Sequence, residues 1–286
     1  MAGAGVFPKV AGDLIYYQDY NTIRTTIAGV LGTGSGASGY GQALSSSAVT
    51  QNAKITETHW DNLRSDIDKC LIHQSGSSSL TNISTSNNIS YTLVNAYKTG
   101  ADTAVTNKDV VSGATQSSLA TGVSSNYATP WKTSIRHRVT VTFASSDAAR
   151  NFFNLNGNIR LTASQTGSTA ASKDSNWATL INSLGAIYYT ATNYRAGGNV
   201  VIKAQTFGTG VYVANYYRAW GELTSATTVV ITAIFDDASV QSGAGGASQD
   251  ENISLSITSA VDYYKSIGAI VGPVPSSVAN TAALGP

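Results

Sequence analysis

The chain has 286 residues, of which 42% are hydrophobic and only 12% are charged, about half the share of charged residues that soluble globular proteins usually carry. Its 17 basic residues are scattered and nearly balanced by 16 acidic ones, which excludes a nucleic-acid binder, because such a protein needs a basic stripe to displace counterions. The net charge of +1 gives little self-repulsion and favours burial in permanent contacts between subunits, with a low-charge soluble monomer as the alternative.

Residues 1–76 are predicted to form a helical anchoring module of two antiparallel helices. The first begins near Asp19, follows the helical spacing of apolar residues and ends at Gly32. The second covers residues 56–71, with acidic residues in its first turns where the helix dipole favours them. Its apolar face, which we expect to pack the two helices together, consists of Trp60, Leu63, Ile67 and Leu71.

Residues 77–131 lack a strong period and are expected to be a connector rich in Ser, Thr and Asn. Its first part, Ser77–Ser90, is nearly all Ser, Thr and Asn, with Leu80, Ile83 and Ile89 as the apolar exceptions. This part is either a linker or a strand that pairs only within an assembly.

Residues 132–264 are expected to form a β-rich body. Apolar and polar residues alternate cleanly over Ser134–Phe143, as in a half-buried strand. Helices are predicted at 145–154 and 172–184, and further strands at 158–163, 186–191, 199–206, 210–220, 226–236 and 252–262. The predicted fold class is therefore α+β, with an N-terminal helical pair followed by a mostly antiparallel β domain that contains two inserted helices.

Residues 265–286 are expected to be an extended C-terminal arm. This segment contains three prolines and no charged residue after Lys265. It either docks on a neighbouring subunit, through Ile267, Ile270 and Val271, or is an unstructured end.

The sequence also bears on where the protein is made. No stretch approaches the roughly 20 apolar residues that a membrane-spanning helix needs. The start, Met-Ala-Gly-Ala-Gly, lacks the basic residues and apolar core of a secretory signal. Cys70 is the single cysteine, which excludes an internal disulfide. We therefore expect synthesis in the cytoplasm and release by another route, such as cell lysis.

Two groups of short motifs carry a resemblance. The first group comprises Phe7–Asp13, Asp19–Ile23, Gly29–Gly32, Gly39–Gln42 and Trp60–Asp66, and the second comprises Val139–Phe143, Asp147–Asn154, Gly157–Leu161 and Ser175–Trp177. The first group resembles the N-terminal module of structural proteins in tailed bacteriophages, notably marine cyanobacterial ones. The second resembles a repeat-type segment of the same virion proteins, although that segment usually has two glycines after Phe-Phe-Asn, where this chain has Asn154-Leu-Asn-Gly157.

This resemblance covers about half of the chain, and its motifs are structural ones. It implies a non-enzymatic component of a phage virion that assembles as a homo-oligomer and contacts other virion proteins. Tail, baseplate, fibre and neck remain open as its place, and capsid decoration is an alternative. The implied location is the virion, after synthesis in the cytoplasm of the bacterial host, which fits a protein released by lysis.

Tyrosine is unusually frequent, with 15 residues. Doublets occur at Tyr16 and Tyr17, Tyr188 and Tyr189, Tyr216 and Tyr217, and Tyr263 and Tyr264, with Trp220 nearby. In a strand a doublet puts one ring on each face, so one ring of a pair is expected outside the local core. We predict that these rings are interface anchors. Core packing is one alternative, and stacking on a host-surface glycan, as in a receptor-recognition module, is another.

Acidic residues cluster once in the β-rich body. Asp236 and Asp237 end one predicted strand, and Asp250 and Glu251 begin the next. If these strands form a hairpin, the four carboxylates gather at one end and can hold calcium, the one cofactor the sequence suggests. Solvated strand ends are the ordinary alternative. A glycosidase pair is a further alternative, but nothing else in the sequence supports hydrolysis, so we expect no enzyme.

Other candidate sites have structural interpretations. Gly34–Gly39 matches the dinucleotide-binding fingerprint letter by letter, but a helix precedes it where a strand is required, so we interpret it as a hinge or close-contact loop. His59, His73 and His137 show no metal-ligand spacing. The last of these lies on the apolar face of its strand and is predicted to be a core histidine.

Overall fold

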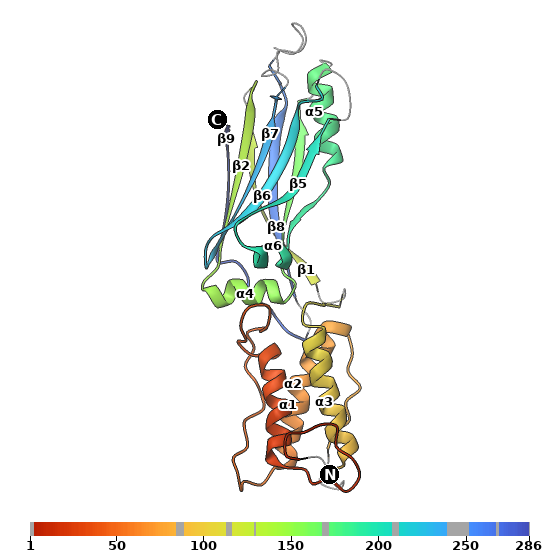
Figure 1. Cartoon of the computed structure of the whole chain (residues 1–286). Coiled ribbons are helices and arrows are strands. Elements are labelled where there is room, and N and C mark those ends of the chain that lie inside the picture. The colour runs from red at the N-terminus through yellow and green to blue at the C-terminus, as the bar shows by residue number, and fades with distance from the viewer. Residues whose placement is uncertain are drawn as a thin grey trace. The chain divides into compact units, whose positions relative to one another are not determined.

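The structure, a computed structural model of the full chain, describes residues 3–83, 89–112, 116–128, 130–167, 172–207, 212–238, 252–266 and 269–285. The chain forms two compact units, one helical and one built of β-sheets (Figure 1). The helical unit comprises Met1–Ser117, Arg150–Asn156 and Lys265–Pro273, and the β unit comprises Ser118–Ala149, Gly157–Tyr264 and Val274–Pro286.

The helical unit is built on α1 (Tyr17–Leu31), α2 (Glu57–Ser75) and α3 (Tyr91–Thr106). Helix α2 is capped at its start by the Thr56 hydroxyl, which accepts a hydrogen bond from the backbone of His59, and Gly76 ends it in the left-handed conformation. The expected seam is present: Trp60, Leu63 and Ile67 are fully buried, and the partly buried Leu71 packs against the same core.

Helix α3 corrects the expected helical pair, because it lies in the segment predicted to be a connector. The Ser90 hydroxyl caps it, and its buried face consists of Val94, Tyr97, Gly100, Ala101 and Ala104. Three of these five residues are Gly or Ala, which give almost no hydropathy signal. Only close packing explains them: a Cβ on Gly100 would approach side-chain carbons of Ile67 and Leu80.

Among the described residues, the β unit contains two antiparallel sheets (Figure 1). The strands are β1 (Gln116–Tyr127), β2 (Ser134–Thr142), β3 (Asn158–Thr166), β4 (Ile187–Tyr189), β5 (Asn199–Thr206), β6 (Tyr216–Ser225), β7 (Thr228–Asp236), β8 (Ser256–Ser266) and β9 (Ser277–Leu284). One sheet has the order β1-β8-β3-β4, and the other has the order β5-β6-β7-β2-β9. Together with the N-terminal helices, these sheets confirm the α+β class.

Within the described residues, three short helices are inserted in this part of the chain, where two were expected. They are α4 (Ser146–Asn154), α5 (Ser172–Ser183) and α6 (Ala191–Ala196), and the last was not predicted. Strand β2 alternates as predicted, with Ile135, His137 and Val139 buried. Helix α5 covers the core through Trp177, whose ring contacts Phe207 at 5.4 Å between centroids.

Two expectations about strand pairing are wrong. The segment expected to be a free C-terminal arm contains β9, which pairs with β2 of its own chain from Ile135↔Leu284 to Thr142↔Ser277. The hairpin on which the calcium hypothesis depends, between the strands expected at 226–236 and 252–262, does not form either, because β7 and β8 belong to different sheets. Both errors have the same origin, since a strand's pattern shows which face is buried but not which strand lies beside it.

Candidate interface on the helical unit

The segment that leads into α1, residues 3–16, is fixed by a buried ion pair. The ammonium of Lys9 lies 2.8 Å from Oδ1 of Asp19, and both side chains are fully buried. Asp19 also accepts hydrogen bonds from the backbone N–H of Gly5 at 2.6 Å and of Tyr16 at 2.7 Å, in the first helical turn where the dipole favours a carboxylate. The ammonium donates in addition to the carbonyl of Gly3 at 2.8 Å. One charge pair therefore fixes both ends of the segment.

Helix α3 holds the middle of the same segment. The side-chain amide of Asn95 accepts from the backbone N–H of Lys9 and donates to its carbonyl, both at 2.8 Å. The Lys9 ammonium also lies 5.8 Å from the ring centre of Phe7 and 5.6 Å from that of Tyr16. Asp13 closes a turn by accepting from the backbone N–H of Val10 at 2.8 Å. These bonds give the segment a defined shape.

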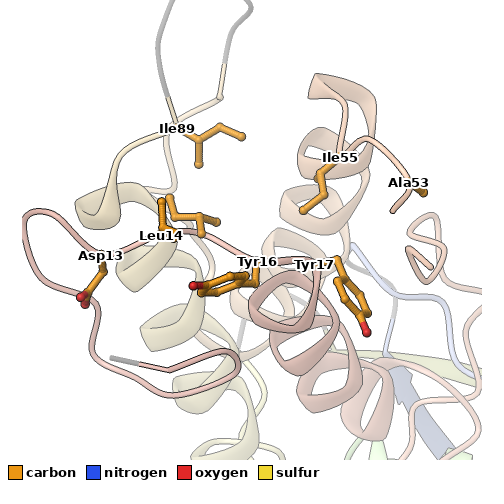
Figure 2. A pocket seen from close by; sticks show the side chains of 8 residues that line it. Asp13, Leu14, Tyr16, Tyr17, Ala53, Ile55 and Ile89 are labelled. Carbon is orange, nitrogen blue, oxygen red and sulfur yellow. The ribbon is translucent and has the colours of Figure 1, made fainter. Parts of the chain in front are cut away.

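This fixed segment presents apolar side chains to the solvent. Val6 is 52% exposed, Val10 53%, Leu14 63% and Tyr16 39%. A hollow of about 570 Å³ lies beside them, and Figure 2 shows it flanked by Ile55 from the segment before α2 and Ile89 from the segment before α3. It is lined by Asp13, Leu14, Ile15, Tyr16, Tyr17, Ala53, Ile55 and Ile89. Exposed apolar groups on an ordered surface are typical of a protein contact site.

The glycine-rich loop is a close-contact loop, as expected. Arg150 donates to the carbonyls of Ser38 at 2.7 Å and Thr33 at 2.6 Å, and the amide of Asn154 donates to the carbonyl of Gly39 at 3.1 Å. Gly39 has a φ of 104°, and a Cβ there would overlap the backbone of Thr33. The loop thus receives side chains from α4, and residues from both motif groups meet here.

The tyrosine doublets alternate as predicted in two strands. Tyr188 is 42% exposed while Tyr189 is fully buried, and Tyr216 is half-buried while Tyr217 is 1% exposed. Tyr189 and Tyr217 therefore belong to the core, which corrects their assignment to an interface. Burial raises the pKa of the Tyr189 hydroxyl to about 12.

The other candidate interface residues have mixed positions. Tyr17, Trp220, Tyr263 and Tyr264 are half-buried. Ile270 is 1% exposed and packs in the core of the helical unit, so its interface assignment is also wrong, whereas Val271 is 60% exposed. Ile267 lies outside the described residues. For the exposed and half-buried residues, an interface role stays a prediction.

The arrangement proposed for calcium is not formed by a hairpin. Asp237 is fully buried in an ion pair with Lys173, 2.5 Å from the ammonium to Oδ2. Asp236 accepts a hydrogen bond from the Tyr216 hydroxyl at 2.7 Å. Asp250 and Glu251 lie outside the described residues. Within the described part of the chain, no three His, Cys, Asp or Glu side chains are grouped so that they could hold a metal ion.

His137 is a core histidine, as predicted. Burial lowers its pKa to about 4, and its Nδ1 lies 2.8 Å from the Ser125 hydroxyl. That hydroxyl donates its proton to Oδ1 of Asn280 at 2.7 Å, so Nδ1 of the imidazole must be the donor to Ser125. The geometry does not suit a base that activates the serine. This trio instead links β1, β2 and β9.

Sequence reasoning missed most of the apolar contact segment. Leu14 and Val10 precede the first helix and follow neither a helical nor a strand period, and Lys9 and Asp19 lie too far apart for a local ion pair. A usable signal was present, namely several apolar residues in a short non-helical stretch.

Comparison of the chain with protein-family models, with curated proteins and with solved structures finds no match. In the regions that the structure describes, no helix is long and apolar enough to cross a membrane.

Proposed function

We propose that this protein is a non-enzymatic structural subunit of a tailed-phage virion, and that it associates with copies of itself through residues 3–16. The observation that carries the proposal is a segment fixed by the buried Lys9–Asp19 pair that nevertheless exposes four apolar side chains. The sequence resemblance to virion proteins supports it as well, since Lys9 and Asp19, whose ion pair fixes this segment, both belong to those motifs.

A second copy of the chain is the partner that fits this surface best. The net charge of +1 opposes self-association very little. The segment carries both exposed side chains outside the hollow, such as Val10, and the hollow bordered by Ile55 and Ile89. A two-fold symmetric contact needs this combination, because the same patch must supply the projection and the recess.

Exposed apolar area sets the size of the expected effect. Fully burying a Leu side chain contributes about 1.5–3 kcal/mol, so the 63% of Leu14 that is exposed is worth about 1–2 kcal/mol in a contact. The double variant Val10→Ser/Leu14→Ser should therefore weaken self-association by at least about tenfold. Sedimentation equilibrium of the full chain over a range of concentrations measures this change.

The matched control is Val105→Ser/Val110→Ser. These two valines are 39% and 50% exposed and lie at or after the end of α3, away from Asn95 in its first turns. The control should associate like the unmodified chain. A chain that stays monomeric at all concentrations, or a control that weakens association equally, would contradict the proposed contact.

The virion assignment is tested separately. Mass spectrometry of purified, nuclease-treated phage particles should detect the chain in a fixed ratio to the capsid protein, and labelled antibodies should mark one location on imaged particles. Finding the chain only in the soluble fraction of lysed host cells would refute the virion assignment whether or not the protein self-associates.

A further inference from the structure

The outer face of the five-stranded sheet carries three arginines and a tryptophan in two adjacent rows. Strand register places Ala204, Arg218, Ile234, Arg136 and Ala283 in one row, and Val201, Trp220, Thr232, Arg138 and Thr281 in the next. The residues that alternate with them, such as Ile135 and Ala219, are buried. The two rows therefore lie on the opposite face of the sheet, where most of their residues are exposed, although Thr232 at the centre of the second row is buried.

Within the part of the chain that the structure describes, no ion pair neutralises the positive charges of this arginine face. Arg138 and Arg218 are exposed, and among the described residues none of the three arginines has a carboxylate within ion-pair distance. The guanidinium of Arg218 lies 5.9 Å from the ring centre of Trp220. By contrast, Arg160 on the other sheet is paired with Asp262.

The spacing of the arginines on this face lets two of them contact one ligand. Arg218 and Arg136 flank Ile234, so the two arginine backbones are about 10 Å apart, two strand spacings. At this distance the two charges repel each other only weakly across solvent. An anionic ligand above Ile234 would lie between the two guanidinium groups and attract both.

The surroundings favour a sugar over a compact anion. Flanking positions in the rows carry small side chains, among them Ala204, Ala283 and Thr281, which leave room above the sheet. Trp220 and Tyr216 add half-buried aromatic rings on the same side. Two carboxylates also lie on this face, in the next rows on either side: Asp236, which accepts a hydrogen bond from Tyr216, and Glu222. An extended chain of uniform negative charge would meet both of them, whereas the hydroxyls of a sugar can donate to them.

We propose that this arginine face binds an acidic polysaccharide. Carboxylates of uronic-acid units engage the guanidinium groups of Arg136, Arg138 and Arg218, whose planar forks match a carboxylate. A sugar ring stacks on Trp220. This binding site is separate from the self-association segment and adds recognition of a charged glycan to the assembly function.

Calorimetric titration of the full chain with oligogalacturonate tests the proposal. The unmodified chain should bind this probe and not its carboxyl-reduced, neutral counterpart. Arg138→Gln/Arg218→Gln should weaken binding at least about tenfold, the effect of losing one charge-assisted hydrogen bond. Trp220→Ala should weaken it too, while Trp220→Tyr, which keeps a ring, should retain most of it. Both arginines are exposed, so the double variant should unfold like the unmodified chain.

The control Lys54→Gln/Lys69→Gln removes the same net charge from the helical unit and should bind normally. Three results would overturn the proposal, since each shows that the arginine face does not recognise an acidic sugar. The control could weaken binding as much as the arginine double variant does. The neutral oligosaccharide or a single-stranded DNA oligomer could bind as tightly as oligogalacturonate does. An absence of binding to oligogalacturonate and to alginate oligosaccharides would overturn it as well.

Discussion

Replacing Lys9 with Met should destabilise the helical unit strongly. The substitution keeps most of the length and volume of the side chain. It removes the ammonium that lies 2.8 Å from Oδ1 of Asp19, so this carboxylate stays buried without its cation. Removing one partner of a buried ion pair destabilises by about 3–5 kcal/mol. The backbone N–H groups of Gly5 and Tyr16 still donate to Asp19 and keep the effect toward the lower end of that range.

Urea unfolding followed by circular dichroism measures the loss, and a second substitution tests its cause. In Lys9→Met/Asp19→Asn no buried charge remains, so at least half of the lost stability should return. The control is Lys98→Met, because Lys98 pairs with Asp102 at the surface, where the two side chains are 22% and 54% exposed. That substitution should cost less than about 1 kcal/mol.

Two results would refute this reasoning. A loss for Lys9→Met no larger than that for Lys98→Met would mean that the pair is solvated in solution. No recovery in the double variant would mean that lost packing of the Lys9 stem, and not an unpaired charge, causes the destabilisation. Self-association measured on the same samples should fall with Lys9→Met, because the contact segment loses its anchor.

Three further predictions concern both units. Burial lowers the pKa of His73 and of His137 to about 4, whereas a histidine in the unfolded chain has a pKa of about 6.5. The unfolded chain therefore binds more protons as the pH falls, and stability should decrease between about pH 6.5 and 4, by up to about 3 kcal/mol for each histidine. Urea unfolding at several pH values should show a smaller decrease for His137→Gln than for the unmodified chain. Gly221→Ala should destabilise the β unit by about 1–3 kcal/mol in thermal or urea unfolding, because the new methyl group would overlap the ring of Tyr189, and an unchanged midpoint would contradict this packing. Deleting residues 277–286 should expose the edge of β2 and increase aggregation and dye binding, whereas a soluble, normally stable truncated chain would restore the interpretation of a free arm.

Local patterns in the sequence were enough to place the elements that have a clear period. Helix α2 was predicted correctly from the spacing of Trp60, Leu63 and Ile67, and strand β2 from its alternation. Both predictions succeeded because an apolar or polar residue indicates whether its own position is buried or exposed. The buried role of His137 followed from the same alternation. Helix α3 escaped this reasoning, since its contact face uses Gly100 and Ala104 and is defined by what packs against it.

The sequence by itself determined the class of the fold, the low charge and the alternation of the tyrosine doublets. Only the tertiary structure decided that residues 277–284 pair with β2, that Asp237 is paired with Lys173, and that Arg136, Arg138 and Arg218 share one face. The physical reason is that periodicity records whether a side chain meets water or the core. Which distant strand or charge lies beside it depends on the register and packing of the whole chain, and no local window of sequence contains that information.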